Sequence, residues 1–143
     1  MPINFFSKSE THREFSNLAP FPIELDGQSW PSAEHYYQAQ KFTDPALQEK
    51  IRTAKKPVIA KKLAQKYGSR VRANWAEAKD SVMERAVRAK FEQHASLREL
   101  LLSTSDEDLA ETAPNDYYWG VGADVAGQNR LGLLLMRIRA ESR

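Results

Sequence analysis

The chain contains no cysteine, which excludes disulfide bonds, thiolate nucleophiles and cysteine-ligated metals. It has no apolar run near the ~20 residues that span a bilayer, and its N-terminus lacks the basic start and apolar stretch of a secretory signal. Its three histidines are scattered, without the spacing of a metal-binding motif such as HExxH. We therefore expect a cytoplasmic protein with no metal site and no association with membranes.

What the chain does contain is typical of one globular domain. Its 143 residues are 41% hydrophobic and 28% charged, and a chain of this length buries most of the surface that its unfolded form exposes. The sequence has no internal repeat, low-complexity tract or linker. We expect a single domain over residues 1–143.

Apolar periodicity and capping residues predict a mainly helical α+β fold with a small sheet. Ser32 and Asp44-Pro45 mark helix starts. The Asp26-Gly27 pair is typical of a tight turn between two strands. The predicted helices are about 33–42, 45–53, 57–67, 76–94, 97–102 and 128–141, and the predicted strands are about 3–6, 22–25, 28–30 and 109–112.

Positive charge is concentrated in one segment, although the net charge is only +2. Residues 50–76 contain nine basic residues and no acidic one, while the other 12 basic residues are outnumbered by 19 acidic ones. Such a segment favours an anionic partner such as phosphate or nucleic acid, but it also fits the solvated side of an amphipathic helix. The apolar side of that helix is expected to carry Val58, Ile59, Leu63, Ala64 and Tyr67.

One face of the predicted helix 33–42 is the first candidate for chemistry. Glu34, Gln38 and Lys41 are spaced i, i+4 and i+7, so their side chains project from one side of a helix. A carboxylate, an amide and an amine suit an active site, and they equally suit a wet surface. Trp30 and Pro31 before the helix indicate that its start is packed inside the protein, which would organise Glu34 for catalysis.

The stretch 114–132 is the second candidate. It places three aromatic residues, Tyr117, Tyr118 and Trp119, beside Gly120 and Gly122. Aromatic rings can stack on a flat base, and glycines let backbone N–H groups approach phosphate oxygens. These glycines lack the preceding strand of a dinucleotide-binding fingerprint. The alternative is an aromatic surface loop that leads into the last helix.

Two single residues have open roles. Asn17 lies in a turn before two prolines and either binds a ligand or braces the turn. Trp75 lies just before the longest predicted helix and is either a hydrophobic staple or a stacking surface for a base.

Several motifs together match a known family over about residues 3–139. They are Phe15-Ser16-Asn17, the stretch from Trp30 to Phe42, Lys90-Phe91, Trp119-Gly120-Val121-Gly122 and Asn129-Arg130-Leu131-Gly132. In this order they resemble the NADAR domain family, to which the YbiA-like N-glycosidases of riboflavin intermediates belong. The set of motifs is far more specific than any one of them.

The resemblance implies a hydrolase that cleaves an N-glycosidic bond to ribose without a cofactor. The implied substrates are phosphorylated ribosylamino-pyrimidine intermediates of riboflavin synthesis or ADP-ribosylated guanine, and the latter would make an ADP-ribosylated nucleic acid a partner. Glu34 matches the family's catalytic glutamate, and Asp116 falls on a position of its site. The expected substrate-binding residues are Phe15, Ser16, Asn17, Gln38, Trp75, Trp119, Gly120, Gly122 and Asn129.

Two routes to this cleavage are open. Breaking a ribosyl C–N bond builds positive charge on C1′ and the ring oxygen. Glu34 would stabilise that charge and take a proton from the attacking water, with Asp116 sharing the task or holding the ribose hydroxyls. Alternatively, a neutral Lys41 amine attacks C1′ and forms a Schiff base, or Lys41 binds a phosphate as ammonium.

Two non-catalytic functions compete with this interpretation. A module that only binds ADP-ribose or a similar nucleotide would use the aromatic loop but would not need Glu34. A nucleic-acid-binding domain would use the basic residues of segment 50–72 and would bind in a strongly salt-dependent way.

Overall fold

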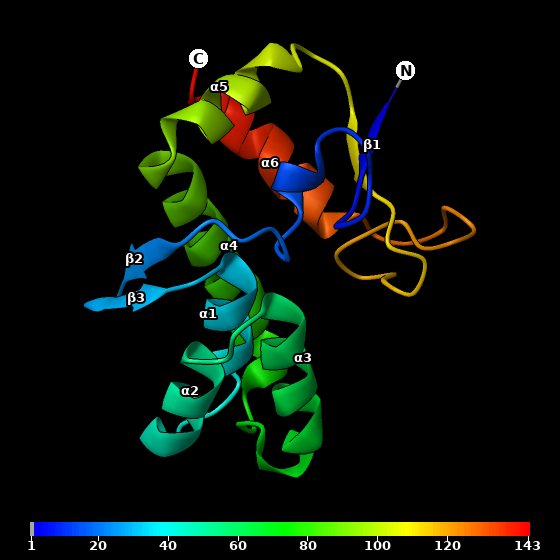
Figure 1. Cartoon of the computed structure of the whole chain (residues 1–143). Helices are drawn as coiled ribbons and strands as arrows, with labels where there is room; N and C mark the ends of the chain where they lie inside the picture. The colour runs from blue at the N-terminus through cyan, green and yellow to red at the C-terminus, as the bar shows by residue number, and fades with distance from the viewer. Residues whose placement is uncertain (1) are drawn as a thin grey trace. The chain divides into compact units, whose positions relative to one another are not determined.

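The computed structural model describes residues 2–143 and confirms the predicted mainly helical α+β class (Figure 1). Two short pairs of strands accompany the helices. No helix within this described range is long and apolar enough to cross a membrane. The helices are α1 Ala33–Ala39, α2 Pro45–Arg52, α3 Pro57–Lys66, α4 Trp75–Gln93, α5 Ala95–Ser103 and α6 Arg130–Glu141, with short 3-10 helices η1 Arg13–Phe15 and η2 Gly68–Arg70. The strands are β1 Ile3–Phe5, β2 Ile23–Leu25, β3 Gln28–Trp30 and β4 Leu109–Glu111.

The chain forms two compact units. The first combines the residues up to Ser16 with His94–Arg143, and the second is the continuous segment Asn17–Gln93. The sequence-based expectation of one domain over residues 1–143 stays a prediction.

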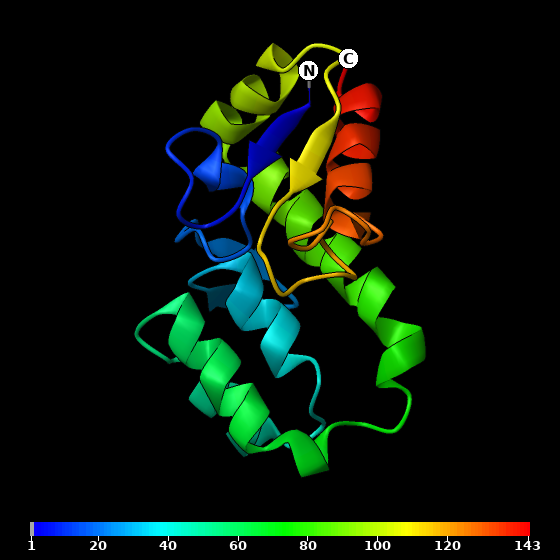
Figure 2. The ribbon, with the colours of Figure 1, turned by 90° about the vertical axis from the view of Figure 1, so that its right-hand side faces the viewer.

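In the first unit, β1 and β4 pair in parallel, with Ile3 opposite Leu109 and Phe5 opposite Glu111. Figure 2 shows these strands as blue and yellow arrows, with the red helix α6 beside the yellow one. Gly132 allows this close approach, because a Cβ at that position would collide with the carbonyl oxygen of Leu109. Phe5 packs edge-on against Phe15 at 5.7 Å between ring centroids.

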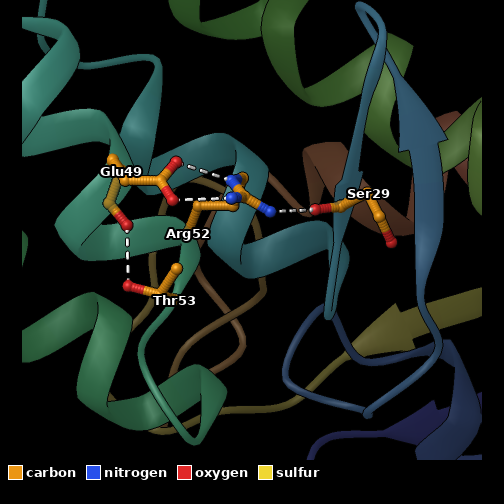
Figure 3. A network of polar contacts seen from close by, with 4 residues as sticks. All are labelled: Ser29, Glu49, Arg52 and Thr53. Carbon is orange, nitrogen blue, oxygen red and sulfur yellow. Dashed lines mark hydrogen bonds and ion pairs between the residues drawn. The ribbon is translucent and has the colours of Figure 1, made fainter.

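In the second unit, α1 packs against α2, α3 and α4, and all seven of its residues are buried. The hairpin β2–β3 is antiparallel, and the backbone of Glu24 in β2 exchanges two hydrogen bonds of 2.8 Å with the side chain of Gln93 in α4. Figure 3 shows how Arg52 joins α2 to β3. Its guanidinium binds both carboxylate oxygens of Glu49 and also donates to the carbonyl oxygen of Ser29 at 3.1 Å.

The predicted apolar face of α3 is wrong in part. Val58 and Ile59 are 44% and 38% exposed, and the buried residues of α3 are Ala60 and Ala64. Two small side chains one turn apart let α3 come close to α1, so the helix is rotated away from its larger apolar residues. Of the five residues expected to face the core, Ala64 alone is fully buried.

Two helix ends also differ from the expected positions. α1 ends at Ala39, three residues before the predicted end at Phe42, because the last turn tightens and the N–H groups of Lys41 and Phe42 donate three residues back. α6 begins at Arg130 rather than at Gln128, because Asn129 has a left-handed backbone with a φ of 50°, which a right-handed helix cannot include.

Candidate active site

Glu34 is the second residue of α1 and is held on two sides. Its backbone N–H donates to the carbonyl oxygen of Asn17 at 3.2 Å. Its carboxylate Oε2 accepts a short hydrogen bond of 2.5 Å from Nε2 of Gln38, one turn further along the helix. Glu34 is 8% exposed and Gln38 4%. The interpretation of this face as a wet helix surface is therefore wrong, and the carboxylate is an oriented, largely desolvated group.

Ser32 and His35 fix the start of α1. Ser32 is the N-cap, and its Oγ accepts from the backbone N–H of His35 at 3.1 Å. Nε2 of His35 lies 2.9 Å from the carbonyl oxygen of Ala54, and Nδ1 lies 2.7 Å from Oγ of Ser32. A carbonyl can only accept, so the proton is on Nε2 and Ser32 donates to Nδ1. Burial lowers the pKa of His35 against the raising effect of the Ala54 hydrogen bond, which keeps the ring neutral as a structural brace.

Lys41 follows the end of α1 and lies within electrostatic reach of Glu34. Burial is the largest effect on this amine and lowers the pKa of Lys41. The charge of Glu34 raises that pKa, and the charges of Lys61 and Lys79 lower it. The structure thus groups Glu34, Gln38 and Lys41 as the sequence spacing predicts, and it makes the Lys41 amine easier to deprotonate than an exposed lysine.

Aromatic rings lie beside this amine. Nζ of Lys41 is 5.7 Å from the ring centroid of Tyr37. That ring in turn packs edge-on against Trp75, the first residue of α4, with centroids 5.1 Å apart and an interplanar angle of 63°. Tyr37, Lys61 and Lys79 are not among the site residues that the sequence predicts. Only Lys79 carried a usable signal, since it is four residues after Trp75 and lies on the same side of α4.

Asn17 braces the site and also has an unused acceptor. Its carbonyl oxygen holds the N–H of Glu34, and its Nδ2 donates to Sδ of Met83 at 2.9 Å. Its Oδ1 is buried and has no hydrogen-bond partner within residues 2–143, and the same is true of Oε1 of Gln38. Both open roles that the sequence allows for Asn17 are therefore compatible with the structure.

In the first unit, Asp116 organises the aromatic loop between β4 and α6. Its Oδ1 accepts from the backbone N–H groups of Tyr118 at 3.2 Å and Trp119 at 2.8 Å. This side chain-to-backbone arrangement is the one with which aspartate stabilises tight turns. The ring of Trp119 packs edge-on against Tyr118, and the Tyr118 ring lies 4.8 Å from the guanidinium of Arg130.

The glycines of this loop are explained by close packing. A Cβ at Gly120 would collide with the Glu111 carboxylate and lie 2.7 Å from the Glu111 carbonyl oxygen. Gly122 has a positive φ of 73° and lies against the ring of Tyr117. Asn129 braces the same region, because its side-chain amide accepts from Glu111 N–H at 3.0 Å and donates to Leu109 at 2.9 Å. The loop is therefore held against β4 by close packing and by hydrogen bonds.

The predicted site residues divide between the two units. The second unit contains Asn17, Glu34, Gln38, Lys41 and Trp75. The first unit contains Phe15, Ser16, Asp116, Trp119, Gly120, Gly122 and Asn129. Phe15 is 1% exposed and packs on Phe5, so packing in the core accounts for its ring. Across residues 2–143, no group of three or more histidine, aspartate and glutamate side chains is arranged to hold a metal ion.

Comparison with known proteins gives consistent matches over nearly the whole chain. The NADAR domain matches residues 4–143. The chain is 48% identical over 139 residues to the N-glycosidase YbiA of Escherichia coli (strain K12), which covers 97% of this chain and 87% of YbiA. It is 42% identical over 140 residues to the riboflavin biosynthesis protein VVA0006 of Vibrio vulnificus (strain YJ016), covering 98% of this chain and 38% of that protein. The NMR structure of E. coli YbiA has a TM-score of 0.90 at 48% identity and covers 99% of this chain and 84% of that one.

Proposed function

The chain belongs to the NADAR domain family, and from this premise we propose that it is an N-glycosidase that hydrolyses the bond between a nitrogenous base and a phosphorylated ribose. The proposed substrate is a phosphorylated ribosylamino-pyrimidine intermediate of riboflavin synthesis. The names of two similar proteins, an N-glycosidase and a riboflavin biosynthesis protein, support this choice. ADP-ribosylated guanine is the second candidate, supported by the exposed lysines of α3, Lys61, Lys62 and Lys66, which suit a larger anionic substrate.

The observation that carries the proposal is the state of Glu34. This carboxylate is buried and hydrogen-bonded, with its backbone tied to Asn17 and its side chain tied to Gln38. A carboxylate held in this way needs little reorganisation when positive charge develops on a nearby sugar, and the low local dielectric strengthens that attraction. A non-catalytic module would have no need for a desolvated carboxylate.

In the first route, Glu34 acts on water. The water oxygen bonds to C1′ while Glu34 takes its proton, and the C–N electron pair leaves with the base, which takes up a proton from solvent. General base catalysis of this kind contributes about 10²–10⁴ in rate. Stabilisation of the oxocarbenium-like charge and positioning of the sugar supply the rest.

In the second route, Lys41 is the nucleophile. Its neutral amine bonds to C1′, the base leaves with the C–N electron pair and a proton, and opening of the sugar ring gives a Schiff base that water hydrolyses. The lowered pKa of Lys41 supports this route, because the neutral amine is present at lower pH than usual. Trapping with borohydride separates the two routes, since a covalent adduct forms in the second route alone.

The aromatic residues and the loop have supporting roles in this proposal. Trp75 is the proposed stacking surface for the base, and the expectation that Trp119 also stacks on it stays a prediction. The expectation from the sequence that Asp116 shares the work of Glu34 or holds ribose hydroxyls stays a prediction, and its Oδ1 stabilises the turn in which it lies. The substrate-binding role expected of Phe15, Ser16, Gly120, Gly122 and Asn129 stays a prediction. Packing in the core accounts for Phe15, and bonds to β4 account for Asn129.

The experiment that tests the proposal is a direct substrate comparison. The protein is incubated with a phosphorylated ribosylamino-pyrimidine and, separately, with ADP-ribosylated guanine, and released free base is measured by mass spectrometry. We expect release from the first substrate. Release from the second alone would move the proposal to ADP-ribosylated bases, and no release from either would contradict it.

A further inference from the structure

Two residues that hydrogen-bond to Glu34 each carry a buried amide oxygen that has no partner in the described part of the chain. Oδ1 of Asn17 and Oε1 of Gln38 are both inaccessible to solvent and have no hydrogen-bond partner within the described residues 2–143. The two residues are 8% and 4% exposed. A buried, unpaired acceptor destabilises a folded protein, and most native structures hold few of them. Two such acceptors on residues that contact Glu34 therefore call for a physical reason.

The orientation of each amide confirms that the unpaired atom is an oxygen. Only an N–H can donate to Oε2 of Glu34, so the Gln38 amide cannot be turned over without placing two acceptors face to face. The Asn17 amide directs Nδ2 at Sδ of Met83, a weak acceptor that has no proton to offer to Oδ1. The unpaired atom of each amide is consequently the oxygen, which can only accept a hydrogen bond.

Both residues hydrogen-bond to Glu34. The backbone carbonyl oxygen of Asn17 accepts the backbone N–H of Glu34, and Nε2 of Gln38 donates to its carboxylate. Two residues that contact Glu34 therefore each carry a buried, unpaired acceptor, in addition to the carboxylate of Glu34 itself. A ligand that fits there must offer at least two N–H or O–H donors.

We infer that Asn17 and Gln38 accept hydrogen bonds from the 2′- and 3′-hydroxyl groups of the substrate's ribose and make the enzyme selective for ribosides over 2′-deoxyribosides. The inference rests on the proposed function, in which Glu34 acts at C1′. The 2′-hydroxyl is on the carbon next to C1′ and the 3′-hydroxyl on the one after it, so a cis-diol supplies two adjacent donors close to the carboxylate. Amino groups on the base are the other source of such donors, and the experiment separates them.

The expected selectivity follows from the cost of an unpaired acceptor. A site built to bind a hydroxyl discriminates strongly against the analogue that lacks it, because its own polar group is then left buried and unpaired. We expect the 2′-deoxy substrate to have a kcat/KM about 10–100-fold lower than the ribo substrate. A substrate whose base lacks the amino group beside the glycosidic nitrogen is expected to lose less than about threefold.

The test uses Asn17→Leu and Gln38→Met, which remove the acceptors with little change in side-chain size. In these variants we expect the ratio of ribo to 2′-deoxy kcat/KM to fall towards 1. A purely structural role would slow both substrates equally and leave the ratio unchanged, and that outcome overturns the inference. If the variants instead change the ratio of kcat/KM between substrates with and without the amino group on the base, the assignment to ribose is overturned.

A second measurement does not depend on turnover. Ribose 5-phosphate and 2-deoxyribose 5-phosphate are compared as ligands in thermal unfolding of the wild-type protein. We expect the first sugar to raise Tm more than the second, and we expect Asn17→Leu to lose the difference. Equal shifts in the wild type overturn the inference even where hydrolysis is observed. A difference without any hydrolysis supports it and counts against the proposed function alone.

The stability of the ligand-free protein gives a third readout with a matched control. Asn17→Leu removes an unpaired buried acceptor and with it only the Nδ2 bond to Sδ of Met83, a weak acceptor, so its Tm is expected to equal or exceed the wild-type value. Gln48→Met is the control, because Nε2 of Gln48 donates to the carbonyl oxygen of Phe42 at 2.7 Å and so has a structural role. We expect this control to lower Tm and to leave the ribo to deoxy ratio unchanged. A loss of stability in Asn17→Leu as large as in the control contradicts the inference.

Discussion

Replacing Gly120 with alanine tests the packing of the aromatic loop on β4. The new Cβ would overlap the Glu111 carboxylate and lie 2.7 Å from the Glu111 carbonyl oxygen and 3.0 Å from that of Asp116. The carboxylate can rotate, but the two backbone oxygens belong to β4 and to the turn at Asp116 and cannot move alone. Overpacking of this kind costs about 1–3 kcal/mol, and the rigid neighbours favour the upper end of that range. For a chain of this size, 3 kcal/mol corresponds to a Tm decrease of about 6–12 °C.

Gly68→Ala is the matched control for this substitution. A Cβ at Gly68 meets no atom within 4 Å, and its φ is not positive. We expect a change in unfolding free energy within about 0.5 kcal/mol. Both variants are measured by urea unfolding followed by circular dichroism. If Gly120→Ala unfolds at the same urea concentration as Gly68→Ala, the reasoning about the loop is refuted.

Three further predictions concern α1 and the residue groups beside it. Ser32→Ala removes the N-cap and leaves Nδ1 of His35 without its donor, so urea unfolding should show a loss of about 1–3 kcal/mol, and a loss below 0.5 kcal/mol would contradict the cap. The pKa of His35 is lowered in the folded state, so below about pH 6.5 the unfolded chain binds a proton that the folded chain does not. The unfolding free energy should therefore be full above that pH and fall by up to about 1.4 kcal/mol per pH unit below it. His35→Gln should remove this part of the pH dependence, measured by urea unfolding between about pH 5 and 7. The pKa of Lys41, followed by NMR of the reductively methylated amine, should lie below the usual ~10.4 and should fall further in Glu34→Gln, because the charge of Glu34 raises it; a rise in that variant would contradict the proximity of the two groups.

Local signals in the sequence were sufficient for most of the fold. Ser32 and Asp44 cap α1 and α2 as expected, and the turn at Asp26-Gly27 joins β2 to β3. The apolar repeat of α4 is buried at Val82, Met83, Ala86, Val87 and Phe91. The family resemblance drawn from the motifs is also confirmed. These features depend on neighbouring residues, which is why they can be read along the chain.

Features that depend on tertiary packing were harder to predict. The rotation of α3 follows from how closely Ala60 and Ala64 approach α1, and no local pattern distinguishes that arrangement from burial of Val58 and Ile59. Similarly, the close packing that requires Gly120 involves β4, nine residues earlier in the chain at Glu111. Long-range contacts of this type override local periodicity.

The candidate site shows the same division. The spacing of Glu34, Gln38 and Lys41 predicts that they lie near one another, and the structure shows Gln38 bonded to Glu34 and Lys41 within reach of its charge. Tertiary packing of α1 on α4, and the turn at Asn17 before α1, determine the other contacts. These are the unpaired oxygens of Asn17 and Gln38 and the contact of Tyr37 with Trp75. Spacing carries no information about those contacts.

The central claim is that the Glu34 carboxylate performs the hydrolysis. Glu34→Gln keeps the size of the side chain and an oxygen that accepts from Gln38, so the local structure should be retained. The most direct measurement is the single-turnover rate of base release, together with the Kd of the same phosphorylated ribosylamino-pyrimidine, in wild type and variant. We predict a rate loss of about 10²–10⁴ with a Kd within about threefold of wild type. A variant that binds its substrate and releases base at the wild-type rate would contradict the account.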